Sequence, residues 1–108
     1  MIAKIPKISA VDLKARIDAG EDLFLLDVRE PYEFTGYTGH IPASMLIPMA
    51  KLASLLPTLP KDKTIIVICH SGSRSLHAAS LLHKHGFDAL SLDHGMIEWN
   101  NEGFDVER

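Results

Sequence analysis

The sequence predicts an α/β protein whose five-stranded, mostly parallel sheet is covered by helices on both faces. Short apolar runs without polar alternation recur along the chain, as expected for parallel strands that are buried on both faces. Segments with the apolar spacing of helices alternate with these runs, which favours right-handed crossover connections. With 108 residues, 46% of them hydrophobic and 23% charged, we expect one globular domain over 1–108.

The expected elements follow one another in chain order with few interruptions. Ser9 is a candidate N-cap of the first helix, Pro31 fits the first position of the second, and Gly86 fits the end of the fourth. Helices are expected over 10–18, 31–34, 51–56, 75–85 and 95–100. Strands are expected over 7–8, 23–28, 44–48, 64–69 and 89–92.

Charge and hydropathy exclude several classes of partner. The 11 basic and 14 acidic residues give a net charge of −3, which argues against a nucleic-acid-binding face and a polybasic membrane patch. No apolar run approaches the roughly 20 residues of a membrane span. The N-terminal residues lack the apolar stretch of a signal peptide. We therefore expect a cytoplasmic protein with no nucleic-acid or membrane partner.

The stretch over 64–74 is the most informative part of the chain. A β-branched apolar run ends in Cys69, small polar residues and Gly72 follow, and Arg74 precedes a helix. In a parallel sheet this order places the thiol at the carboxyl end of a strand, beside a helix N-terminus. Free backbone N–H groups and the helix dipole favour an anion there, which suits a nucleophilic thiolate. The alternative is that Cys69 is a small buried hydrophobic residue.

Cys69 is also the only cysteine, which excludes an internal disulfide and a multi-cysteine zinc site. The histidines have no recognised ligand spacing, since His83 and His85 are two residues apart on a helix and point to different sides. We therefore expect no metal and no cofactor. A free, activated thiol fits a reducing compartment. Because no second cysteine can resolve an oxidised or sulfur-loaded Cys69, the acceptor must come from outside the chain.

Four stretches together resemble the rhodanese, or sulfurtransferase, domain family over about residues 8–106. These stretches are 25–34, 39–44, the strand and loop ending at Arg74, and 86–99. The resemblance implies a three-layer α/β/α fold with strand order 3-2-4-5-1. In that order strands 2 and 4 are neighbours whose connections run in opposite directions, and open α/β sheets bind ligands at such a switch point.

The resemblance also implies a chemistry. Cys69 takes a sulfane sulfur from a donor such as thiosulfate, becomes a persulfide, and passes the sulfur to cyanide, a thiol or a protein acceptor. The loop residues His70, Ser71, Gly72 and Ser73 would form an anion cradle from their backbone N–H groups, with Arg74 stabilising charge or anchoring the loop. Asp27 and Arg29 are candidates either for substrate binding or for a structural ion pair. We expect a monomer or a weak homodimer.

Two features depart from the family pattern. About two extra residues lie between Glu33 and Gly39, and His94 occupies a position where the family commonly has a second Gly. Both changes are expected to affect the rim of the pocket.

Three other functions compete with sulfur transfer. Dual-specificity phosphatases of the cell cycle share the fold, but their loop has one more residue between Cys and Arg than the four that separate Cys69 from Arg74. The same difference weighs against arsenate reductase activity. A non-catalytic rhodanese-like interaction module is the third alternative, although such modules often lose the Cys.

Overall fold

The computed structural model describes residues 4–108. Residues 1–3, the start of the segment in which no signal peptide is expected, lie outside the described residues. Within the described range, none of the helices has the length and apolar character needed to cross a bilayer.

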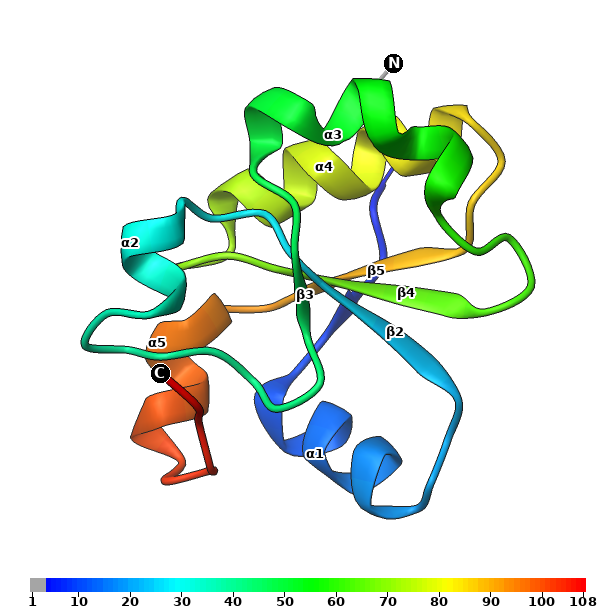
Figure 1. Ribbon diagram of the computed structural model, residues 1–108. Coiled ribbons are helices and arrows are strands. Elements are labelled where there is room, and N and C mark those ends of the chain that lie inside the picture. Colours follow the sequence, from blue (N-terminus) through cyan, green and yellow to red (C-terminus); the bar gives the residue numbers. More distant parts are fainter. Residues whose placement is uncertain (1–3) are drawn as a thin grey trace.

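A five-stranded sheet forms the centre of the molecule, with the order β1-β5-β4-β2-β3 (Figure 1). Every strand pair in it is parallel. The order confirms the expected 3-2-4-5-1 arrangement, and the sheet is entirely rather than mostly parallel. The strands are β1 (Lys7–Ile8), β2 (Leu23–Asp27), β3 (Met45–Leu46), β4 (Thr64–Ile68) and β5 (Ala89–Leu92).

Helices cover both faces of this sheet (Figure 1). α3 and α4 lie over one face, and α1 and α5 lie over the other, so the three expected layers are present. The helices are α1 (Ala10–Asp18), α2 (Pro31–Phe34), α3 (Met49–Leu55), α4 (Ser73–Lys84) and α5 (Gly95–Asn101), with a short 3-10 helix over Leu56–Thr58.

The central strand β4 supplies both halves of the core. Ile65 and Val67 belong to the cluster under α3 and α4, whereas Ile66 and Ile68 belong to the cluster under α1 and α5. Successive side chains of a strand point to opposite faces, so an uninterrupted apolar run is what this position requires.

The helix that follows the Cys loop begins earlier than the sequence indicated. α4 starts at Ser73 rather than at Ser75, and Gly72 is its N-cap with φ 106°. Since glycine has no Cβ, it adopts this left-handed conformation readily and lets the helix begin immediately after the turn. Arg74 therefore lies in the first turn of α4.

The remaining boundaries differ by only a few residues. α3 begins at Met49 instead of residue 51, and the chain around Pro57 continues as 3-10 helix rather than stopping. β3 is shorter than the expected 44–48, because it pairs with β2 at two positions only. Ser9 caps α1 as expected, its side chain accepting the N–H of Asp12 at 3.0 Å.

Candidate active site at the end of strand β4

The thiol of Cys69 lies directly after β4, at the carboxyl edge of the sheet. Residue Asp27 at the end of β2 is in register with Ile68, so the ends of both strands reach the same edge. From here the chain leaves β2 toward β3 and β4 toward β5, on opposite sides. The expected switch point is therefore present and carries the cysteine.

The sulfur atom occupies the position of a helix cap. Sγ of Cys69 accepts the N–H of Gly72 at 3.1 Å and the N–H of Ser75 at 3.3 Å. Ser75 is the third residue of α4, and its N–H is one that an N-cap side chain normally satisfies. Gly72 has no side chain, so the sulfur takes that role and lies at the positive end of the helix dipole.

Burial does not make Cys69 an ordinary core residue. The residue is 1% exposed and touches the apolar cluster under α3 and α4, as the alternative interpretation requires. Its sulfur nevertheless accepts two backbone N–H groups, which a residue packed only among apolar side chains would not do.

Four further backbone N–H groups, in the loop and at the start of α4, have no acceptor within residues 4–108. Among the described residues, no hydrogen bond is donated by the backbone N–H of His70, Ser71, Ser73 or Arg74. The carbonyls of Cys69 and His70 accept the N–H groups of Met96 and Ile97 at 2.9 and 3.1 Å. Since a trans peptide holds its N–H opposite its C=O, the N–H groups of His70 and Ser71 point away from α5.

The start of α5 fits closely against the Cys loop. A Cβ on Gly95 would collide with the carbonyl oxygens of Cys69 and His70, so only glycine permits this approach. His94, which departs from the family pattern, is the N-cap of α5 with φ 60°. Glycine is the residue that this conformation favours, which gives a physical reason for the family preference. The His94 side chain is exposed.

Two buried serines, Ser75 and Ser91, form a hydrogen-bonded network with the sulfur, and sequence reasoning did not identify either of them. The Cys69 thiol donates to Ser75 Oγ at 3.4 Å, and that hydroxyl donates to the Gly72 carbonyl at 3.1 Å. Ser75 Oγ also lies 2.7 Å from Ser91 Oγ on β5. Both serines are at most 1% exposed. Because a hydroxyl can either donate or accept, this network can serve both the thiol and the thiolate.

Arg74 pairs with a carboxylate of the protein itself. Its guanidinium forms two parallel bonds to Glu33 of α2, with NH1 to Oε1 at 2.7 Å and NH2 to Oε2 at 2.8 Å. The hydrogen bond from Arg74 lowers the pKa of Glu33 from 4.5 to about 2, assisted by the N–H of Glu30. The same hydrogen bond raises the pKa of Arg74. Glu33 stands within one of the family-like stretches, but its partner lies 41 residues away and could not be inferred from spacing.

Asp27 and Arg29 form a second pair that is completely buried. Arg29 Nε and NH2 donate to Asp27 Oδ1 and Oδ2 at 2.9 and 2.8 Å, and both side chains are 0% exposed. Arg29 also donates to Thr38 Oγ1 and to the Gly39 carbonyl, at 2.9 and 2.6 Å. This geometry favours the structural interpretation, in which the pair ties β2 to the loop over 35–39, over direct contact with a substrate.

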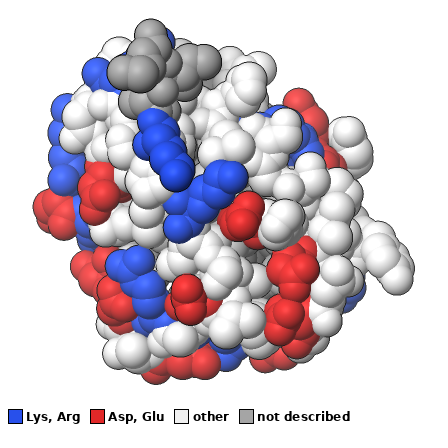
Figure 2. All heavy atoms as spheres, turned by 180° about the vertical axis from the view of Figure 1, so that it is seen from behind, with Lys and Arg blue, Asp and Glu red and all other residues white. Residues whose placement is uncertain are grey.

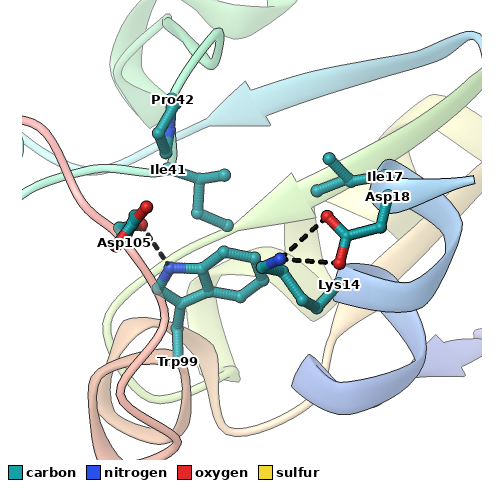
Figure 3. A pocket seen from close by; sticks show the side chains of 7 residues that line it. All are labelled: Lys14, Ile17, Asp18, Ile41, Pro42, Trp99 and Asp105. Carbon is teal, nitrogen blue, oxygen red and sulfur yellow. Dashed lines mark hydrogen bonds and ion pairs between the residues drawn. The ribbon is translucent and has the colours of Figure 1, made fainter. Parts of the chain in front are cut away.

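A separate cavity of about 180 Å³ lies between α1, α5 and the loop at Ile41 (Figure 3). It has no lining residue from the Cys loop. The indole N–H of Trp99 points to the Asp105 carbonyl at 3.0 Å, and Lys14 is paired with Asp18 at 2.7 Å. The Trp99 indole, the Lys14 ammonium and the Asp18 carboxylate at this cavity thus already have partners within the chain. Its lining residues are Lys14, Ile17, Asp18, Ile41, Pro42, Trp99 and Asp105.

The charged surface agrees with the composition. On the face opposite to that of Figure 1, acidic and basic side chains are interspersed (Figure 2). A nucleic-acid-binding face would instead gather basic side chains in one area.

Comparison with known proteins agrees with this geometry. The sequence model of the rhodanese-like domain matches residues 9–102. YtwF of Bacillus subtilis, named as a candidate sulfurtransferase, is 38% identical over 99 residues, which cover 92% of this chain and 94% of YtwF. A sulfurtransferase of Allochromatium vinosum is 31% identical over 103 residues, covering 94% of each chain. The crystal structure of a rhodanese-related protein from Thermoplasma volcanium superposes with a TM-score of 0.84 at 35% identity, covering 93% of this chain and 95% of that one.

Proposed function

Because this chain belongs to the rhodanese-like domain family, we propose that it is a sulfurtransferase that carries sulfur as a persulfide on Cys69. The observation that carries the proposal is the capping position of the sulfur, which accepts the N–H groups of Gly72 and Ser75 at the start of α4. A thiolate in this position is stabilised without a metal and remains nucleophilic.

The first half of the reaction is a displacement at sulfur. The Cys69 thiolate attacks the outer sulfur of a donor such as thiosulfate, a new S–S bond forms, and the original S–S bond breaks. The electron pair of that bond leaves with the sulfite, so charge is conserved and the cysteine becomes a persulfide anion. The N–H groups of His70, Ser71, Ser73 and Arg74, which have no acceptor in the described part of the chain, support this step, because they can bind the terminal sulfur as it gains charge.

The second half removes that sulfur. An external thiolate or cyanide attacks the terminal sulfur, the persulfide bond breaks, and its electron pair returns to Cys69 as thiolate. Since Cys69 is the only cysteine, the acceptor comes from outside the chain, and a protein acceptor is an alternative to a small thiol. The likeness to YtwF of Bacillus subtilis and to the sulfurtransferase of Allochromatium vinosum supports this reaction class.

The loop length supports sulfur over phosphorus chemistry. Only four residues separate Cys69 from Arg74, and α4 begins within the loop at Ser73. A phosphoryl or arsenate group brings several outer oxygens and requires a wider ring of N–H groups than one terminal sulfur does. The intact cysteine and its capping contacts also argue against a module that only binds a partner.

The test is the intact mass of the protein after incubation with thiosulfate, before and after cyanide. We expect a gain of one sulfur atom that cyanide removes with release of thiocyanate. Cys69→Ser is expected to gain no sulfur while keeping the native circular dichroism spectrum. Thiocyanate formation by Cys69→Ser near the wild-type rate, or no loading of the wild-type protein by any sulfane donor, would refute the proposal.

A further inference from the structure

The inference concerns the charge of the sulfur donor and rests on the proposed function. Two guanidinium groups lie at the edge of the sheet that carries Cys69. Arg29 is fully buried against Asp27, and Arg74 is held by Glu33. Each positive charge is thus matched by a carboxylate of the protein itself. A dianionic donor approaching the loop meets the positive end of α4 and the N–H groups of the loop. The charge of the Arg74 guanidinium, however, is already neutralised by Glu33.

The ion pair between Glu33 and Arg74 has a well-defined geometry although it lies near the surface. The Glu33 side chain is 15% exposed, and its two oxygens take both terminal nitrogens of Arg74. Oε1 also accepts the Glu30 N–H at 3.0 Å, which fixes the carboxylate at the start of α2. Bidentate pairs of this kind are geometrically specific and stronger than neutral hydrogen bonds.

We propose that Glu33 is a specificity-determining residue, which occupies Arg74 and so directs Cys69 toward singly charged sulfane donors rather than doubly charged thiosulfate. A monoanionic donor needs less compensating charge than a dianion, and the helix N-terminus with its N–H groups can supply it. For a dianion, the carboxylate of Glu33 adds a repulsion and withholds the one guanidinium on the loop.

Two donors isolate the effect of charge. Methanethiosulfonate is a monoanion and thiosulfate is a dianion, and both transfer their outer sulfur to a thiolate. In each case the donor S–S bond breaks, the Cys69 S–S bond forms, and the electron pair leaves with methanesulfinate or sulfite. Cyanide then regenerates the thiolate as thiocyanate forms, so one assay reads both donors.

The experiment compares kcat/KM for the two donors in wild-type protein, Glu33→Gln and Glu30→Gln. Glu33→Gln removes the charge that pairs with Arg74, whereas Glu30→Gln removes an equal charge from the same end of α2 without touching Arg74. We expect Glu33→Gln to raise the thiosulfate to methanethiosulfonate ratio at least about fivefold, the effect of one unit charge at contact distance in a water-like dielectric. Glu30→Gln should change the ratio less than twofold.

Both donors are assayed on the same preparation of each variant. A smaller fraction of folded protein therefore lowers both kcat/KM values equally and cancels in their ratio. Glu33→Asp, which keeps the charge, provides a second variant and should retain nearly the wild-type ratio. The gain in Glu33→Gln should shrink as ionic strength rises, because salt screens the dianion more than the monoanion. Equal ratios in wild type and Glu33→Gln, or equal gains in Glu33→Gln and Glu30→Gln, would overturn the inference. If neither donor loads wild-type Cys69, the sulfurtransferase proposal fails instead.

Discussion

The hydrogen-bonded pair of Ser75 and Ser91 beneath Cys69 provides a double-mutant cycle whose outcome follows from the structure. Ser75 Oγ joins the Gly72 carbonyl, the Ser91 hydroxyl and the Cys69 sulfur, and it is fully buried. Ser75→Ala removes these bonds and leaves the Ser91 hydroxyl buried without its partner. A lost hydrogen bond costs about 1 kcal/mol and an unsatisfied buried group about 1–3 kcal/mol, so we expect a destabilisation of about 2–4 kcal/mol.

Ser91→Ala is expected to cost less. Ser75 keeps its bond to the Gly72 carbonyl in that variant, and only one hydrogen bond is lost, at about 1 kcal/mol. In the double variant neither hydroxyl remains, so no buried hydroxyl is left without a hydrogen-bond partner between α4 and β5. The double variant should therefore be destabilised by about 2 kcal/mol, which is about 1–3 kcal/mol less than the sum of the single changes.

Urea unfolding of the four proteins at neutral pH measures these free energies, with equal slopes as the check that unfolding stays two-state. The rate of Cys69 alkylation in each protein reports the thiol separately from stability. We expect Ser75→Ala to slow alkylation, because the hydroxyl no longer reaches Sγ, and Ser91→Ala to slow it less. Strictly additive free energies, within about 0.3 kcal/mol, would show that the two hydroxyls do not depend on each other.

Three further outcomes are expected. Asp27→Ala leaves Arg29 buried without its partner and should lower the free energy of unfolding by about 3–5 kcal/mol in urea, whereas a loss below about 1 kcal/mol would contradict the buried pair. Glu33, whose pKa is lowered to about 2, contributes stability that is complete above pH 4.5 and is lost as pH falls toward 2. The shift in the pKa of Glu33 corresponds to at most roughly 3 kcal/mol of stability, and because Arg74 is 38% exposed we expect about 1–2 kcal/mol. This contribution is measured as the difference in unfolding free energy between wild type and Glu33→Gln, which should decrease as the pH is lowered. Parallel pH profiles of the two proteins would be inconsistent with the pair. Insertion of one Gly after Gly72 should widen the loop and weaken sulfur transfer at least tenfold, or about 1.4 kcal/mol of transition-state stabilisation, at unchanged circular dichroism. Unchanged sulfur transfer in that variant would remove the argument from loop length.

The sequence by itself determined the alternation of strands and helices and the place of the thiol. The apolar run before Cys69 has to be buried on both faces, because Ile65 and Ile66 point to opposite sides of β4. A cysteine followed by Gly72 and a helical segment could only lie at the strand end, beside a helix N-terminus. These are local consequences of periodicity and turn chemistry, and the resemblance to a known family added the order in which the strands are arranged.

Only the tertiary structure decided which groups surround the sulfur. Ser75 faces Ser91 because α4 packs over β5, and Arg74 faces Glu33 because α2 lies beside the start of α4. These partners are 16 and 41 residues apart, and neither residue type specifies its partner in advance. Gly95 is likewise required by the carbonyls of Cys69 and His70, which lie against it because β4 and β5 are neighbours in the sheet. Long-range contacts of this kind depend on the packing of whole elements, and a one-dimensional pattern does not record them.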